Sequence, residues 1–243
     1  MIITGKDTQK GGKEKKDMAT RQFFQGIILI SCIVFMGSCA NNNDMYHNFE
    51  DLSQHEKEGT DYDINYQSVN SDILIIAIHG GSIESGTSEL AQEISKDKFD
   101  YYQFAGIKQA DNYDLHISSE AFDEPKAVEM VNDSKHTISL HGYKSEDKNT
   151  YMGGLDKELA ASIKKELQKN GFEANGPPKQ FAGIDKENIT NRNSQSKGAQ
   201  LEISTAQRKS FFKDEDFSSN NRKNKTDEFY DYAEAVQKGI DNR

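Results

Sequence analysis

Three short apolar stretches of this 243-residue chain each carry a side chain that can bind a metal ion or move a proton. The run ILIIAI ends in His79, and Glu84 follows after a pair of glycines. A second run, HTISLH, ends in His141, and a third, AQLEIS, holds Glu202 between two apolar residues. Histidine and carboxylate side chains are common zinc ligands and common general bases. These four residues are therefore the first candidates for a catalytic site.

Two imidazoles and one carboxylate form a hydrolytic zinc site when the fourth position is left for water. A further carboxylate that stays off the metal can act as the general base for that water. Glu202 stands out because a carboxylate within an apolar strand is costly to bury unless it is paired or functional. The competing interpretation is that His79 and His141 are hydrogen-bonded core residues at strand ends. The residue types and their spacing leave both interpretations open.

Two other nucleophilic mechanisms find no support in the sequence. The glycines after His79 could form the oxyanion loop of a serine hydrolase, but that class also needs a G-x-S-x-G elbow, and the chain has none. The two cysteines, Cys32 and Cys39, both lie in one N-terminal apolar segment. We therefore exclude a cysteine nucleophile and expect any metal ion to be held by His, Asp or Glu.

Arg192 is a further candidate for substrate binding. It lies in the polar sequence NRN, ahead of the stretch that holds Glu202. A planar guanidinium group can bind a carboxylate through two hydrogen bonds or stabilise a developing oxyanion. The alternative is a solvated loop arginine.

The remaining histidines give weaker signals. His116 alternates with apolar residues, so it could face solvent, a partner or the active cleft, and His136 opens a strand. We expect structural roles for these two residues. His47 and His55 lie in a polar segment, where we expect them to be solvated.

Short β-branched runs alternate with helical patterns along the body of the chain. We expect strands over residues 72–78, 100–105, 112–118, 136–141, 150–154, 172–175 and 199–204, and helices over residues 87–96, 124–131, 155–170, 205–212 and 226–240. This alternation predicts an α/β class protein, a single domain with a mixed, mostly parallel sheet flanked by helices. Active sites in such folds form beyond the carboxyl ends of the strands, where His79 and His141 lie.

The first 39 residues resemble an export signal. A lysine-rich start precedes the apolar run GIILISCIVFMG, which is shorter than the roughly 20 apolar residues of a membrane-spanning helix. The sequence MGSC, which ends at Cys39, is similar to the lipobox of bacterial lipoproteins. We expect an exported protein, either a cell-surface lipoprotein lipidated at Cys39 or a secreted protein. Membrane contact is expected only through this segment, as a lipid or an uncleaved anchor.

The composition of residues 40–243 predicts a tether followed by a folded domain, and the net charge argues against some classes of partner. Residues 40–60 are polar and rich in asparagine, which predicts a tether, and we expect the folded domain to span residues 61–243. The formal net charge of -10 argues against nucleic-acid binding, because a phosphate backbone requires a basic surface. An anionic substrate would need a local basic cleft.

Four motifs in order, HGGSIESGT, SLHGY, NITNRN and GAQLEIS, resemble the poly-γ-glutamate hydrolase family of bacilli and their phages. The resemblance covers about residues 61–212. It implies a zinc carboxypeptidase-like (phosphorylase/hydrolase-like) fold and one zinc ion held by His79, Glu84 and His141. It also implies Glu202 as the general base and Arg192 as the contact to a substrate carboxylate or to the oxyanion.

The activity implied by the resemblance is hydrolysis of γ-glutamyl amide bonds in poly-γ-glutamate by metal-activated water. We expect the protein to be a monomer. Lys144, Lys179 or Lys197 could then hold further substrate carboxylates. One alternative is a related zinc amidohydrolase or peptidase that acts on small N-acyl amino acids or peptidoglycan peptides. A second alternative is a non-catalytic, lipid-anchored protein that binds the polymer.

Overall fold

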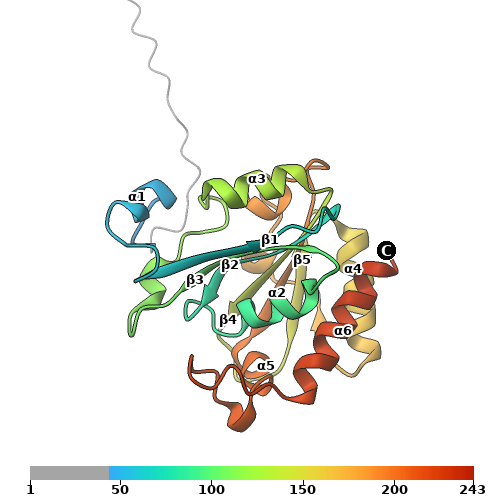
Figure 1. The fold of residues 1–243 in the computed structure, drawn as a ribbon. Coiled ribbons are helices and arrows are strands. Elements are labelled where there is room, and N and C mark those ends of the chain that lie inside the picture. Colours follow the sequence, from blue (N-terminus) through green and yellow to red (C-terminus); the bar gives the residue numbers. More distant parts are fainter. Residues whose placement is uncertain (1–43) are drawn as a thin grey trace, which may run out of the picture. The chain divides into compact units, whose positions relative to one another are not determined.

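The computed structural model describes residues 44–243, so the expected export segment, with Cys39, lies outside the described residues. Seven strands form one mixed sheet in the order β1-β3-β2-β4-β7-β5-β6, with helices on both faces (Figure 1). The strands are β1 (Tyr62–Gln67), β2 (Ile73–Gly81), β3 (Asp100–Gly106), β4 (His136–Tyr143), β5 (Thr150–Gly154), β6 (Ala174–Asn175) and β7 (Ala199–Ser204). The helices are α1 (Phe49–Ser53), α2 (Thr87–Ser95), α3 (Pro125–Asp133), α4 (Lys157–Lys169), α5 (Thr205–Ser210) and α6 (Asp227–Asp241).

The predicted α/β domain with a mixed, mostly parallel sheet is confirmed. β2 pairs in parallel with β3 and β4, β4 with β7, and β5 with β6, whereas β1–β3 and β5–β7 are antiparallel pairs. The five helices expected from the sequence are all present as α2 to α6. Within residues 44–243, no helix has both the length and the apolar character needed to cross a membrane.

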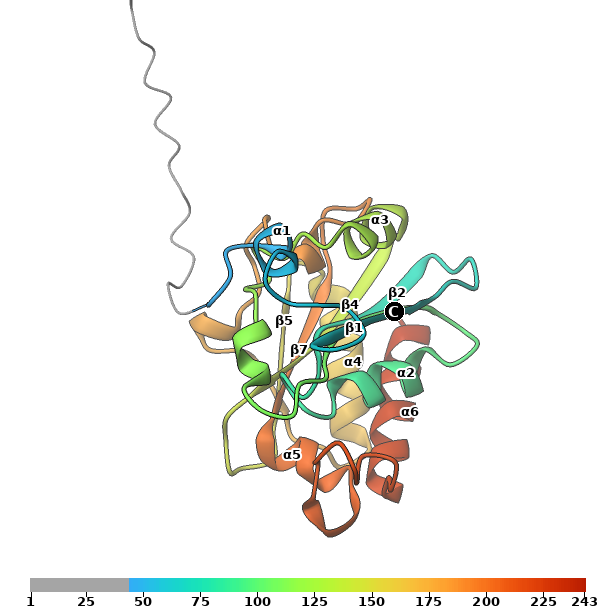
Figure 2. The ribbon, with the colours of Figure 1, turned by 60° about the vertical axis from the view of Figure 1, so that its left-hand side comes forward.

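β2 is buried on both faces, which explains its unbroken run of apolar residues. Ile75 and Ala77 lie in a core cluster with residues of α2, α4 and α6. Their neighbours Leu74 and Ile76 lie in a second cluster with residues of α1 and α3. Figure 2 shows these two groups of helices on opposite sides of the sheet. Successive side chains of the strand therefore serve two separate cores.

The strand order brings the candidate residues to one edge of the sheet. β2, β4 and β7 are parallel neighbours, so their carboxyl ends lie together. The register between β4 and β7 pairs His141 with Glu202. The pairing of β2 with β3 shifts between Ala77 and Gly80, and this irregularity flanks His79.

One strand prediction is corrected, and one strand was missed. Residues 112–118 do not form a strand but begin with a 3-10 turn, η1 (Asn112–Leu115). The amide side chain of Asn112 bonds both the backbone N–H and the carbonyl of Lys108, which favours a turn over an extended chain. β1 was not predicted, because it is an edge strand whose last three residues are exposed and so lacks a buried apolar run.

The expected tether over residues 40–60 is wrong for its described part, residues 44–60. Tyr46 is mostly buried and Leu52 is fully buried, in the same core cluster as β2 residue Leu74. α1 holds Leu52 there, and Asn48 caps this helix by accepting from the N–H of Asp51. The apolar residues of this segment are isolated among polar ones, so composition alone suggested a solvated linker. The folded domain therefore begins before residue 61.

Candidate active site

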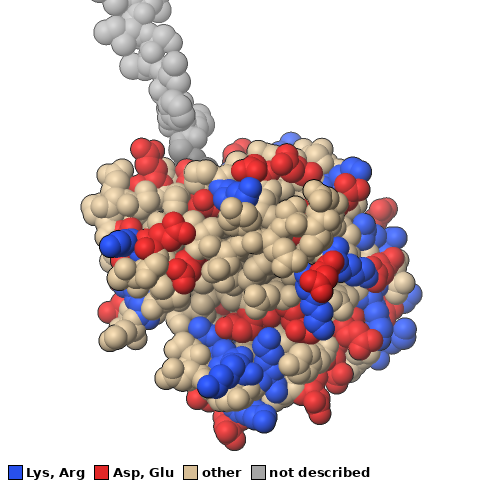
Figure 3. Space-filling model, in the orientation of Figure 1, with Lys and Arg blue, Asp and Glu red and all other residues tan. Residues whose placement is uncertain are grey.

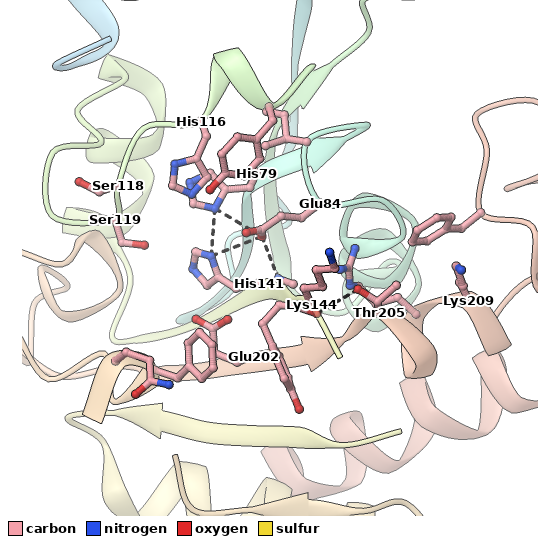
Figure 4. Close-up of a pocket in the computed structure, with 18 of the residues that line it drawn as sticks. His79, Glu84, His116, Ser118, Ser119, His141, Lys144, Glu202, Thr205 and Lys209 are labelled. Carbon is pink, nitrogen blue, oxygen red and sulfur yellow. Dashed lines mark hydrogen bonds and ion pairs between the residues drawn. The ribbon is translucent and has the colours of Figure 1, made fainter. Parts of the chain in front are cut away.

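Three side chains converge at the carboxyl edge of the sheet (Figure 4). His79 lies in β2, Glu84 follows in the next turn, and His141 lies in β4. Nδ1 of His79 lies 3.1 Å from Nδ1 of His141 and 3.4 Å from Oε2 of Glu84. Nδ1 of His141 lies 3.7 Å from the same carboxylate oxygen. The structure thus brings together the three residues predicted to bind a metal, in a His-Glu-His group that could hold one ion.

The tautomer of His79 directs a lone pair into this triangle. Its Nε2 lies 2.8 Å from the carbonyl oxygen of Ile117, and because a carbonyl only accepts, Nε2 carries the hydrogen. Nδ1 of the neutral ring therefore presents a lone pair to a second imidazole and to a carboxylate. Zinc bonds of about 2.0–2.2 Å in a tetrahedron place ligand atoms roughly 3.3–3.6 Å apart. The three measured separations are close to that spacing, so these residues fit a metal ion.

A tight turn at Gly81 brings Glu84 close to His79. Gly81 has a φ of 64°, in the left-handed region that favours glycine, and a Cβ atom there would lie 2.3 Å from the carbonyl oxygen of Gly106. The N–H of Glu84 then donates to the carbonyl oxygen of His79 at 2.9 Å. The five-residue separation of the two ligands is therefore closed by a tight turn.

The two buried histidines and the mostly buried Glu84 perturb one another's pKa values. Burial lowers the pKa of His79 to about 4. Burial acts to raise the pKa of Glu84, but the two histidines outweigh it and hold this pKa well below its ordinary value. Burial acts to lower the pKa of His141, but Glu84 and Glu202 raise it above its ordinary value. Without a metal ion the group favours a proton on His141, a positive charge that a bound cation would replace.

Glu202 lies beside the His-Glu-His group without belonging to it (Figure 4). Its side chain is buried, and its Oε1 accepts a hydrogen bond of 2.8 Å from Nε2 of Gln200. Burial raises the pKa of Glu202 to about 7, a value suited to a group that takes up and releases a proton near neutral pH.

A cavity of about 810 Å³ gives access to all four residues. Its walls come from five parts of the chain: residues 79–84, 113–120, 141–146, 180–181 and 202–217. Lys144 and Lys209 line it, together with Glu120 and Glu146. Figure 3 shows Lys and Arg side chains gathered beside a hollow in the surface. Although the chain has a net charge of -10, three basic residues therefore line the cavity, Lys144, Arg208 and Lys209, beside four glutamates.

Arg192 does not line this cavity, which corrects its predicted contact with substrate. Its Nη2 donates to the carbonyl oxygen of Phe122, and burial lowers its pKa. The guanidinium therefore ties its own loop to the segment ahead of α3. The sequence placed Arg192 near Glu202 along the chain, but the side-chain direction depends on how that loop packs.

Arg208, in α5, lines the cavity instead. Its Nε donates to the carbonyl oxygen of Ile203 at 3.1 Å, and its Nη1 donates to that of Ser85 at 2.8 Å. The guanidinium is held against Gly142, where a Cβ atom would lie 2.4 Å from Cζ of Arg208. A cation fixed in this way can bind a carboxylate or an oxyanion. We missed Arg208, although a basic residue one helix turn beyond the strand of Glu202 was a usable signal.

Of the other predicted cations and histidines, some line the cavity and some lie outside it. Lys179 is not among the lining residues, and Nζ of Lys197 lies 3.6 Å from Oδ1 of Asp156, outside the cavity. His136 also lies near Asp156. His116, for which we expected a structural role, lines the cavity, and its ring stacks on His79 with 3.9 Å between centroids. Its alternation with buried residues did not reveal this position.

Comparisons with known proteins agree with the site. A sequence profile described as poly-gamma-glutamate hydrolase matches residues 46–235. The protein YmaC of Bacillus subtilis (strain 168) is 39% identical over 233 residues, which cover 90% of this chain and 97% of YmaC. The solved structure of a bacteriophage poly-gamma-glutamate hydrolase is 40% identical, with a TM-score of 0.80 over 82% of this chain and 97% of that chain. The zinc-free structure of YndL, also from Bacillus subtilis, is 40% identical, with a TM-score of 0.78 over 82% and 98%. The fold expected from the resemblance is thereby confirmed.

Proposed function

Because this chain belongs to the poly-gamma-glutamate hydrolase family, we propose that it is a zinc enzyme that hydrolyses the γ-glutamyl amide bonds of poly-γ-glutamate. His79, Glu84 and His141 would hold one zinc ion. When bound, zinc acts as a Lewis acid that polarises a carbonyl group and lowers the pKa of bound water towards about 7. The choice of zinc is supported by the two imidazoles and one carboxylate of the site and by the zinc-free description of the YndL structure.

Glu202 is the proposed general base. Its carboxylate takes a proton from the attacking water and later delivers that proton to the leaving nitrogen, which is a poor leaving group until it is protonated. Its raised pKa supports both steps, because the group can hold a proton at near-neutral pH and also release it. The hydrogen bond from Gln200 fixes the carboxylate during this exchange.

Arg208 is proposed to take the role first expected of Arg192. Its guanidinium is held by two backbone carbonyls, so it can meet a substrate carboxylate or the developing oxyanion with little loss of side-chain freedom. Lys144 and Lys209 line the same cavity and supply positive charge for further carboxylates of the polymer.

The observation that carries this proposal is the convergence of two imidazole nitrogens and one carboxylate oxygen, with a second buried carboxylate beside them in one open cavity. A related amidohydrolase or peptidase for small N-acyl amino acids or peptidoglycan peptides would use the same metal site. A non-catalytic polymer-binding protein has no need of a buried carboxylate with a pKa near 7.

One experiment separates these possibilities. The purified chain is analysed for zinc and then incubated with poly-γ-glutamate, with N-acyl amino acids and with peptidoglycan peptides. We expect bound zinc and a fall in the viscosity of the polymer solution. Zinc with turnover of only the small compounds would favour the alternative enzyme, and binding of polymer without any turnover would favour the non-catalytic protein.

We also propose that the protein acts outside the cell. The support lies in the sequence of residues 1–39, with a lysine-rich start, an apolar run and the MGSC sequence. Cys39→Ser should release the protein from the membrane fraction if this cysteine is lipidated. Unchanged membrane association would favour an uncleaved anchor.

A further inference from the structure

Asp44 reaches the wall of the active-site cavity from the first described part of the chain. Its Oδ1 accepts a hydrogen bond of 2.7 Å from Nδ1 of His116, and its Oδ2 accepts one of 2.7 Å from the backbone N–H of Ser118. One carboxylate therefore holds both residues that flank Ile117. The carbonyl oxygen of Ile117 is the acceptor that fixes the tautomer of His79.

His116 forms a second link to the same metal-binding ring. It lies between Tyr113, with 5.1 Å between ring centroids, and His79, with 3.9 Å, and both pairs are stacked. A single N–H···O bond to Ile117 leaves His79 free to rock about that bond, whereas a ring stacked on its face restricts this motion. Both restraints on His79, the carbonyl and the stacked ring, belong to residues 116–118.

Other contacts join the N-terminal segment to this part of the chain, but they lie away from the metal site. The N–H of Phe49 donates to Oδ1 of Asp123 at 2.7 Å. Nζ of Lys108 lies 3.1 Å from Oε1 of Glu56. Neither contact involves a residue that lines the cavity. Asp44 differs from them because its two partners are lining residues that contact or flank the support of His79.

We propose that Asp44 is a positioning residue of the metal centre. By clamping His116 and Ser118, it holds the Ile117 carbonyl and the His116 ring against His79, and so keeps Nδ1 of His79 directed at Glu84 and His141. Asp44 lies ahead of the residues matched by the family profile, 46–235, so the segment next to the expected export signal completes the site. This inference rests on the proposed metal site. Loss of a group that orients a metal-binding histidine commonly lowers metal affinity by about 10- to 100-fold.

The test measures zinc affinity, by competition with a chromophoric chelator, in the full-length chain purified in mild detergent. Asp44→Ala should raise the zinc Kd by about tenfold, at the lower end of that range because Asp44 acts through residues 116–118. Asp44→Asn should give a smaller rise, because its single acceptor oxygen can serve only one of the two donors. Asp123→Ala is the matched control, since it removes a hydrogen bond of the same length that the N-terminal segment makes through the N–H of Phe49. The zinc Kd of this variant should stay within about twofold of wild type.

Thermal unfolding of the metal-free variants separates positioning from general loosening. We expect both variants to lose stability, Asp44→Ala more because it loses two hydrogen bonds rather than one, and zinc affinity to be reduced only in Asp44→Ala. If Asp44→Ala does not fold, the zinc affinity and stability of Asp44→Asn are compared with those of Asp123→Ala instead. Equal zinc affinities for the Asp44 and Asp123 variants would overturn the inference. Absence of zinc binding by the wild type would instead contradict the proposed function.

Discussion

His141 of β4 and Glu202 of β7 are register partners in a parallel pair, so the two side chains lie on the same face of the sheet. One belongs to the His-Glu-His group, and the other lies next to that group while bonded to Gln200. The pairing of these two strands therefore places a buried carboxylate beside the candidate metal without making it a ligand.

Glu202→Gln should abolish most turnover and leave zinc binding intact. Glutamine keeps the shape of the side chain but cannot accept the proton of water, so we expect kcat to fall by about 10²- to 10⁴-fold. Zinc content and viscosity loss on poly-γ-glutamate are measured together. Glu146→Gln is the matched control, because Glu146 lines the same cavity without belonging to the candidate metal group, and its rate should change little. Wild-type turnover by Glu202→Gln would remove Glu202 from the role of base.

The pKa of Glu202 predicts a pH-dependent stability in the metal-free chain. Burial raises this pKa from 4.5 to about 7, so between these pH values the folded state holds a proton that the unfolded chain has released. The contribution of Glu202 to stability is therefore greatest at low pH and is lost as pH rises through about 7. Unfolding in the presence of chelator should find Glu202→Gln more stable than wild type at pH 8 but no more stable at pH 4.5. A difference that does not change with pH would contradict the raised pKa.

Arg208 and Arg192 should respond differently to substitution. Arg208→Lys keeps the charge but cannot retain the planar contacts to two carbonyls, so we expect kcat/KM on the polymer to fall by about 10- to 100-fold, as when a hydrogen bond to a charged group is lost. Arg192→Lys should change stability, because the Phe122 carbonyl loses a donor, and should leave kcat/KM nearly unchanged. A large fall in kcat/KM for Arg192→Lys, with little change for Arg208→Lys, would instead indicate that Arg192 contacts the substrate.

Gly142→Ala should disturb the site through Arg208. The new Cβ atom would lie 2.4 Å from Cζ and 2.6 Å from Nε of Arg208, so the guanidinium must move. The backbone N–H of Gly142 still donates to Glu84, so zinc content should persist while kcat/KM falls about tenfold, as for loss of one charge-assisted contact. Gly176→Ala, at a position with open space, is the control. Full activity of Gly142→Ala alongside impaired Arg208→Lys would show that Arg208 tolerates the added methyl group.

The elements that carry the site were predictable because each has a strong local signal. β2 is a continuous apolar run, β7 carries apolar residues at alternate positions, and the long helices α4 and α6 show regular apolar stripes. β1 and α1 have no such signal, since β1 is half exposed and α1 buries only Leu52. Their places depend on tertiary contacts that a local pattern does not contain.

Side chains at strand ends were easier to assign than side chains in loops. His79, His141 and Glu202 lie where parallel strands terminate, so the fold class alone brings them to one edge. Arg192 and His116 lie on irregular segments, whose direction depends on turn chemistry and on packing against α3 and the N-terminal segment. Asp44 is separated from His116 by 72 residues, and no short-range pattern links them.

Removal and return of the metal tests the proposed function most directly. The purified chain is treated with a strong chelator, dialysed, and assayed for loss of poly-γ-glutamate viscosity before and after zinc is added back, with His141→Ala carried through the same steps. We predict that chelation abolishes depolymerisation, that about one zinc per wild-type chain restores it, and that His141→Ala neither retains zinc nor recovers. Full depolymerising activity in a chain shown to contain no metal would contradict a metal-dependent hydrolase.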